Sequence, residues 1–122
     1  MPDPLHPCLA EIRAKAHQTR RAFESGCFDV SVARRAYTEY APDIDVDLFL
    51  SHSRRLFPAL NCGLCSTYLR AVLHCGTVRR GRYNADLHTV LIVGSTVIDV
   101  TADQFGGPPV YVGPLRQPWT LP

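Results

Sequence analysis

The sequence contains 122 residues, which is the length of one domain and excludes a multidomain chain. Hydrophobic residues make up 46% and charged residues 20%, a balance that excludes a mostly disordered protein. A formal net charge of +2 gives no indication of nucleic-acid binding, and the longest apolar run, residues 90–93, is too short to span a membrane.

The number of cysteines, five, indicates whether the compartment of the protein is oxidising or reducing. An odd number cannot pair completely within one chain, and the first four residues show no basic and then apolar export signal. We therefore expect reduced thiols in a cytoplasmic, reducing compartment.

The basic residues are almost all arginine, and Arg-Arg pairs recur at 20–21, 34–35, 54–55 and 79–80. We interpret these pairs as solvated helix faces, because aromatic side chains are not interleaved with them as on a surface that binds single-stranded nucleic acid. The sequence thus indicates neither a nucleic-acid partner nor a membrane partner.

Apolar residues at helical spacing predict four helices in the first part of the chain. Capping residues, glycines and prolines set their ends. The predicted helices cover residues 8–24 before Gly26, a second stretch from Asp29 or Ser31 to Ala41, a third from Asp43 or Asp45 to Pro58, and a fourth from Asn61 to Gly76.

After the fourth helix the pattern changes to that of strands. Residues 87–93 and 96–101 are rich in Val, Ile and Thr, and Gly94-Ser95 between them predicts a two-residue hairpin turn. A short strand is expected at residues 110–112, and the prolines of the tail predict an extended course over the surface. Helices followed by an antiparallel sheet predict an α+β fold.

The start of the fourth helix carries the most informative cysteines. Asn61 is a good N-cap, which places Cys62 at the first helical position. Free backbone N–H groups and the helix dipole lower the pKa of a thiol there, the usual basis of a reactive cysteine. Cys65 lies one turn further on the same inward arc and can be a plain core thiol. The other cysteines are interpreted as small hydrophobic residues: Cys8, Cys27 and Cys75.

The predicted hairpin places a histidine beside an aspartate. With a two-residue turn Val93 pairs with Thr96, and His88 and Asp99 become diagonal neighbours on one face. An aspartate inside an apolar strand is costly unless it is paired, so we expect its carboxylate to hold the imidazole. A three-residue loop would shift the pairing by one residue, and His88 and Asp99 would then not share a face.

A helix-start cysteine, a histidine and a carboxylate are the components of thiol acyl-transfer chemistry. Cys62 would attack a carbonyl carbon, His88 would move the proton, and Asp99 would orient His88. Backbone N–H groups at the helix start, with the Asn61 side chain, would face the developing oxyanion.

This arrangement resembles the papain-like superfamily, and within it the transglutaminase-like branch. In that branch a cysteine opens a helix, a small residue follows four positions on, here Ser66, and a glycine closes the helix, here Gly76. A histidine that begins a strand, here His88, is followed by a hairpin to an Asp-x-Thr strand, here residues 99–101. The resemblance covers about residues 58–112, and residues 98–105 also look like a motif of small bacterial and phage relatives.

The resemblance implies a minimal papain-like, transglutaminase-like core with Cys62, His88 and Asp99 as the catalytic triad. It implies cleavage of an amide bond of a protein or peptide, by a cysteine peptidase or glutamine deamidase, with no cofactor and no metal. A small effector or toxin, delivered into another cell, or a small processing peptidase would fit this size. Gln104 and Phe105 follow the aspartate strand and are expected to line the substrate cleft, with packing inside the loop as the alternative.

Two features depart from the pattern of the branch. It usually has an aromatic residue two positions after the histidine, where this chain has Val90, and the only tryptophan, Trp119, lies in the tail. The Cys62-x-x-Cys65 spacing also resembles the papain pattern in which the second cysteine is the nucleophile. The helix-start position favours Cys62.

We expect one domain over residues 1–122. Residues 1–57 would form a helical cover or docking region, residues 58–112 the catalytic core, and residues 113–122 an extended, proline-rich tail.

Three other interpretations are open. The C-x-x-C spacing is found in thiol-disulfide redox proteins, but a thioredoxin-like fold needs a buried strand before the helix, and residues 47–60 have helical spacing. A non-enzymatic binding module on the same fold is favoured by the missing aromatic. A zinc site would have to combine Cys62, Cys65 and Cys75 with His74 or His88, although His74 and Cys75 lie on the far side of the helix.

Overall fold

The four predicted helices are present, although the fourth ends at Leu73, with His74 in the left-handed region, before the predicted end at Gly76. A computed structural model describes residues 7–122. The helices are α1 (Leu9–Ser25), α2 (Val30–Tyr40), α3 (Val46–Leu56) and α4 (Cys62–Leu73). The Asp29 carboxylate accepts the backbone N–H of Val32 at 3.2 Å, and the Asp45 carboxylate accepts that of Leu48 at 3.1 Å. Gly26 ends α1 in the left-handed region, with φ 72°, as the sequence predicts.

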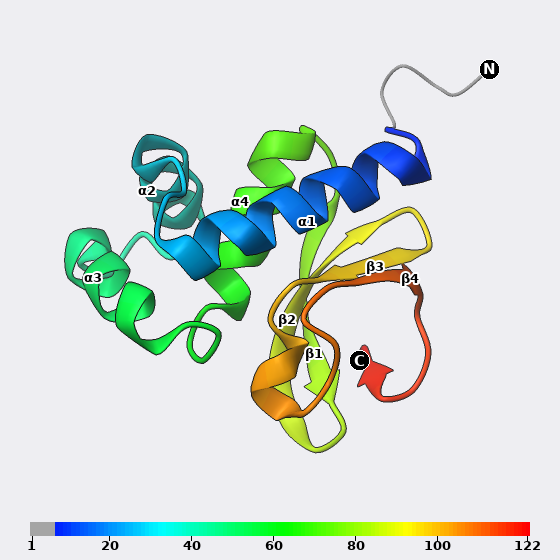
Figure 1. Cartoon of the computed structure of the whole chain (residues 1–122). Coiled ribbons are helices and arrows are strands. Elements are labelled where there is room, and N and C mark those ends of the chain that lie inside the picture. Colours follow the sequence, from blue (N-terminus) through cyan, green and yellow to red (C-terminus); the bar gives the residue numbers. More distant parts are fainter. Residues whose placement is uncertain (1–6) are drawn as a thin grey trace.

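Helix α4 lies at the centre of the helical layer. It contacts α1, α2 and the sheet, whereas α2 and α3 lie on the side of α4 away from the sheet (Figure 1). Its apolar face carries Leu64 and Leu69, which pack with Leu91 and Ile98 of the sheet in the main core. An aromatic cluster fills the space under α1, where the rings of Phe23 and Phe28 stack at 4.4 Å.

The sheet is antiparallel and has the order β4-β3-β2-β1-β5. Its strands are β1 (Thr77–Tyr83), β2 (Asp86–Val93), β3 (Thr96–Asp99), β4 (Tyr111–Pro114) and β5 (Trp119–Thr120), with a short 3₁₀ helix, η1 (Ala102–Phe105), after β3. Helices followed by a curled antiparallel sheet confirm the predicted α+β fold (Figure 1).

The predicted hairpin register is confirmed. Val93 pairs with Thr96 and Leu91 pairs with Ile98, so the turn has two residues. Successive side chains of β2 and β3 therefore point to opposite faces of the sheet. One face packs on the helices, and the other forms a second core that includes Tyr83, Val90 and Trp119.

Two parts of the sheet differ from the sequence-based expectation. Strand β1 was not expected, because arginines and Gly81 interrupt any apolar alternation, yet it pairs with β2 along its whole length. The tail was expected to lie on the surface, but Trp119 pairs with Tyr83 and is only 5% exposed. A side chain at position 81 would overlap the carbonyl oxygen of Thr120, so the absence of a side chain at Gly81 lets this segment approach β1.

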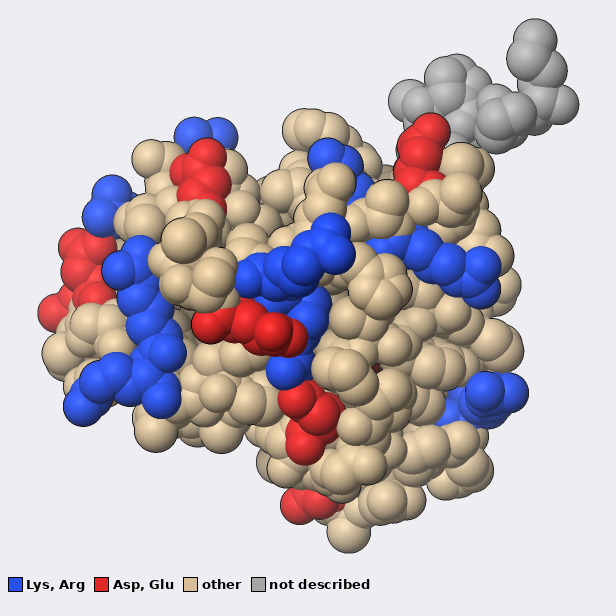
Figure 2. Space-filling view, viewed as in Figure 1, with Lys and Arg blue, Asp and Glu red and all other residues tan. Residues whose placement is uncertain are grey.

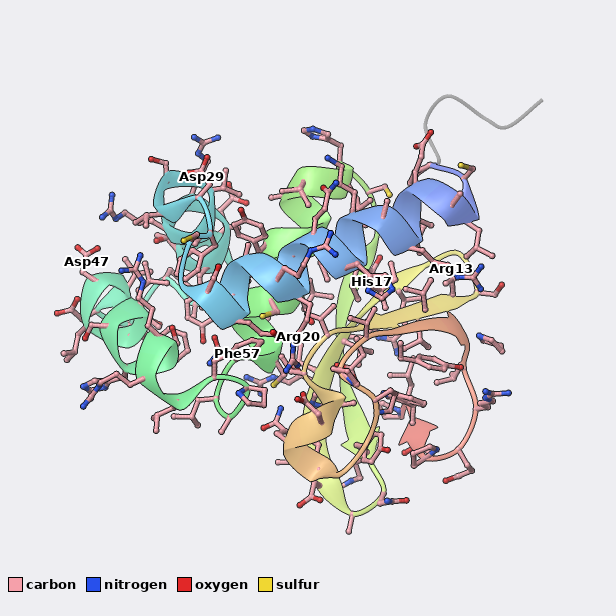
Figure 3. All side chains as sticks on the ribbon, in the orientation of Figure 1. Arg13, His17, Arg20, Asp29, Asp47 and Phe57 are labelled. Carbon is pink, nitrogen blue, oxygen red and sulfur yellow. The ribbon has the colours of Figure 1, made fainter. Side chains whose placement is uncertain are left out.

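Arg20 ties α1 to the segment that follows β3. Its guanidinium is bidentate to the Asp103 carboxylate, with both N···O distances at 2.7 Å, and it donates to the carbonyl of Val100 at 2.9 Å. The guanidinium also lies over the Phe57 ring. Figure 3 shows the two side chains next to each other. Arg20 is 9% exposed, so its interpretation as part of a solvated helix face was wrong.

Most other charged side chains lie on the surface. On the face drawn in Figure 2, basic and acidic side chains alternate between uncharged areas. The exposed pair Arg34 and Asp47 joins α2 to α3, with an N···O distance of 3.0 Å. Among the described residues, no helix is both long enough and apolar enough to cross a membrane.

We predict that Arg20→Met lowers the free energy of unfolding by about 2 kcal/mol, because the Asp103 carboxylate and the Val100 carbonyl lose their donor. Denaturant unfolding measures this loss. The control is Arg21→Met on the exposed side of the same helix, which should change the free energy by less than about 0.5 kcal/mol. Equal effects of both variants would show that the Arg20 contacts contribute no stability.

Candidate active site

Cys62 begins α4, at the helix end nearest to His88 and Thr89. The backbone N–H of Cys65 bonds to the Asn61 carbonyl at 2.8 Å, so the N–H groups before Cys65 have no partner within the helix. Burial would raise the pKa of the Cys62 thiol, but the proximity of the His88 side chain and the Thr89 backbone outweighs it and lowers the pKa below its usual value. Cys62 is therefore placed to form a thiolate.

His88 and Asp99 meet across the β2–β3 hairpin, as the register predicts. Nε2 of His88 lies 2.6 Å from Oδ2 of Asp99, and each side chain is only 1% exposed. Burial would lower the pKa of His88, but the hydrogen bonds and charges of Asp99 and Cys62 raise it to about 9. The pair therefore favours an imidazolium beside a thiolate.

The ring orientation of His88 leaves one nitrogen for the cysteine. Since Asp99 engages Nε2, the other nitrogen is Nδ1, which is buried and has no hydrogen-bond acceptor or donor within residues 7–122. The Cys62 thiol, whose pKa this imidazole lowers, is the group that Nδ1 can serve. His88 thus lies between a thiol and a carboxylate, the order that a catalytic base of this kind requires.

Donors from three residues hold the Asp99 carboxylate. Oδ1 accepts the backbone N–H of Thr101 at 2.9 Å, and Oδ2 accepts the indole N–H of Trp119 at 2.8 Å in addition to the His88 contact. The sequence does not indicate Trp119 as part of the site, because it lies 20 residues after Asp99, in the tail. The signal that could have found it was the missing aromatic at Val90: this tryptophan, the only one in the chain, occupies the space beside the aspartate.

The hollow beside Cys62 differs from the expected cleft. It has a volume of about 300 Å³, and its walls come from α4 and the β1–β2 ladder, including Arg80, Leu87 and His88. Gln104 and Phe105, expected to line the cleft, are not part of its walls. They lie in η1, where the Phe105 ring meets the His88 ring edge-on at 5.1 Å. Phe105 therefore packs against the His88 imidazole and does not line the hollow.

The Asn61 side chain does not face an oxyanion. It is 1% exposed, and its Nδ2 donates to the carbonyls of Ser53 at 3.0 Å and Ala59 at 2.9 Å. It makes no capping hydrogen bond to α4 either. Because its amide N–H groups bond to carbonyls of α3 and of the loop after it, the donors available to an oxyanion are the backbone N–H groups at the start of α4, as also expected.

Cys62 and Cys65 differ in their burial and in the pKa of their thiols. Cys65 is 1% exposed, and burial raises the pKa of its thiol well above the usual value. It is thus a protonated core residue under the conditions that ionise Cys62. Cys8 and Cys27 are exposed, and all five cysteines are free.

The zinc ligands considered from the sequence do not come together. Among residues 7–122, no group of three or more His, Cys, Asp or Glu side chains could hold a metal ion.

We predict that iodoacetamide at mildly acidic pH alkylates Cys62 faster than Cys27, although Cys27 is the more exposed thiol. The lowered pKa keeps Cys62 a thiolate at a pH where an ordinary thiol is protonated. Mass spectrometry of digested protein gives both rates in one sample. In Asp99→Asn the pH midpoint for Cys62 should rise, because the imidazolium loses its carboxylate. Equal rates at the two cysteines would contradict the assignment.

A second prediction concerns Trp119. Trp119→Phe should keep most of the ring packing and lower the free energy of unfolding by about 2 kcal/mol, because the buried Asp99 carboxylate loses a donor. Thermal or denaturant unfolding measures it. The control is Tyr111→Phe in the ring that stacks on Trp119 at 3.9 Å, which removes an exposed hydrogen bond and should cost less than about 1 kcal/mol. A similar loss in both variants would mean that the indole N–H has no special role.

The chain was compared with family models, with curated proteins and with solved structures. None of the three comparisons found a match. The resemblance to the papain-like superfamily therefore stays an expectation from the sequence. The function has to be argued from the geometry of Cys62, His88 and Asp99.

Proposed function

We propose that this protein is a thiol-dependent acyl-transfer enzyme that cleaves an amide bond of a protein or peptide, with Cys62, His88 and Asp99 as its triad. The observation that carries the proposal is the buried His88 ring, which contacts Asp99 through Nε2 at 2.6 Å and lowers the pKa of Cys62. Perturbed titration of a cysteine and a histidine beside an open hollow is typical of an active site.

In the first half of the reaction, the Cys62 thiolate attacks the carbonyl carbon of the amide and forms an S–C bond. The negative charge moves to the carbonyl oxygen, which the free N–H groups at the start of α4 stabilise. As the oxygen charge returns to re-form the carbonyl, the C–N bond breaks and the His88 imidazolium gives its proton to the leaving nitrogen. An acyl thioester on Cys62 and a neutral imidazole remain.

In the second half, water attacks the thioester carbon while His88 takes a proton from it. The C–S bond breaks, the acid product leaves, and the Cys62 thiolate and His88 imidazolium are restored. Asp99 keeps the ring in place and stabilises its charge in both halves, because the Trp119 and Thr101 donors fix the carboxylate.

The same first step serves a peptidase and a glutamine deamidase. In a peptidase the leaving nitrogen belongs to the polypeptide backbone, whereas in a deamidase it leaves as ammonia from a side-chain amide. The five free cysteines suit a compartment in which thiols stay reduced. The redox alternative is less well supported, because α4 is preceded by helix α3 and a loop, not by a buried strand.

The test is intact-mass spectrometry of candidate protein substrates after incubation with the enzyme. A gain of about one dalton in the substrate means deamidation, and shorter chains mean proteolysis. We expect Cys62→Ala and His88→Ala to abolish the change and Asp99→Asn to slow it by roughly a hundredfold or more. The control is Cys65→Ala, which removes a buried thiol without touching the triad and should retain activity. A modification that survives Cys62→Ala would refute this nucleophile.

A further inference from the structure

The hollow beside Cys62 continues along the sheet as a groove. A second hollow of about 400 Å³ shares Arg80, Gly81 and Leu87 with it and extends to Leu121. The two hollows together follow the β1–β2 ladder away from Cys62. An extended peptide whose amide lies at Cys62 would therefore continue over this part of the sheet.

Apart from Cys62 and His88, the ionisable side chains that line the groove are arginines. Arg80 and Arg82 line it and are exposed, and none of the described residues that line either hollow is Asp or Glu. Within residues 7–122 neither arginine forms an ion pair. Nη1 of Arg82 donates to the carbonyl of Ala85 at 2.9 Å, which leaves its other guanidinium N–H groups and its charge to a ligand.

The pairing of β1 with β2 places both arginines on the same face, next to residues that line the hollow. Arg80 is the cross-strand partner of Thr89, which lines the hollow together with Cys62, and Arg82 is the partner of Leu87 in the next pair on the same face. The hydrogen bond of Arg80 to the Tyr40 hydroxyl, 3.4 Å from Nε, leaves its terminal N–H groups free. Side chains two positions apart on a strand are about 7 Å apart, which is also the spacing of alternate side chains in an extended peptide.

We propose that this groove selects substrates with acidic side chains at alternate positions beside the amide that Cys62 attacks. Arg80 binds the nearer carboxylate and Arg82 the farther one, as guanidinium groups bind carboxylates in bidentate geometry. Leu87, which is 75% exposed and lies opposite Arg82 on the neighbouring strand, contacts an apolar part of the same peptide. The proposal rests on the proposed function for the position of the amide, but the binding of an acidic peptide does not require catalysis.

The first experiment therefore measures binding to the inactive Cys62→Ala variant. One fluorescent peptide is made in four versions, whose central segment reads Glu-Leu-Glu, Gln-Leu-Gln, Lys-Leu-Lys or phosphoserine-Leu-phosphoserine, and anisotropy gives the Kd. We expect the glutamate version to bind roughly 10-fold tighter than the glutamine version and the lysine version to bind weakest. Equal affinities of the glutamate and glutamine versions would overturn the proposal. A clear preference for phosphoserine over glutamate would overturn the choice of carboxylates.

Variants locate the binding site. Arg80→Gln and Arg82→Gln, each made in Cys62→Ala, should weaken binding of the glutamate peptide roughly 3- to 10-fold. The matched control is Arg21→Gln, which removes an exposed arginine on α1, outside the groove, and should leave Kd unchanged. If Arg21→Gln weakens binding as much as Arg80→Gln, the attraction is only that of the net charge and the proposal fails.

Turnover by the active enzyme separates this proposal from the proposed function. Hydrolysis of amides without any preference for acidic flanking residues would refute the groove and leave the function standing. Tight, arginine-dependent binding of acidic peptides that the active enzyme never cleaves or deamidates would refute the function and leave the groove standing. Hydrolysis with a preference that Arg80→Gln removes would support both.

Discussion

The buried carboxylate of Asp99 is the constraint on which the arrangement of this domain depends. A charge that is 3% exposed is costly unless donors surround it, and this one has donors from three separate parts of the chain. They are His88 on β2, the Thr101 backbone and the Trp119 indole. The carboxylate thus joins the central hairpin, the segment after β3 and the last strand at one point.

The helical part of the chain holds the other half of the site. Asn61 fixes the loop before α4 through the carbonyls of Ser53 and Ala59, so the first turn of the helix has a defined position over the sheet. Arg20 acts at a greater distance, by binding the Val100 carbonyl and the Asp103 carboxylate just after Asp99. Residues 1–57 were expected to be a cover or a docking region, and Arg20 shows that α1 also supports the segment next to Asp99.

The sequence predicts those features that depend on local spacing. Capping by Asp29 and Asp45 and the stop at Gly26 depend on residues within one helical turn, and the hairpin register depends on Gly94-Ser95 and the two-residue period of strands. Because that register decides the face of each side chain, the proximity of His88 to Asp99 follows from it. The Cys62 position follows in the same way from the helix start.

Contacts between residues far apart in the sequence could not be predicted from local spacing. The Arg20–Asp103 pair joins residues 83 apart, and Trp119 reaches Asp99 only because the tail returns to the edge of β1. Strand β1 was missed because its exposed face carries arginines in place of alternating apolar residues. Asn61 was assigned to the oxyanion by its residue type, whereas the loop carbonyls around it use its donors.

Gly81 has a consequence for how sequences of this kind can diverge. It lies on a partly exposed strand, where most positions accept many residues, yet any side chain there would collide with the Thr120 backbone. Substitution would push β5 away from β1, and with it the indole that binds Asp99. Related chains that keep the tryptophan in the tail should therefore keep glycine at this position, and chains that lose one should be free to lose the other.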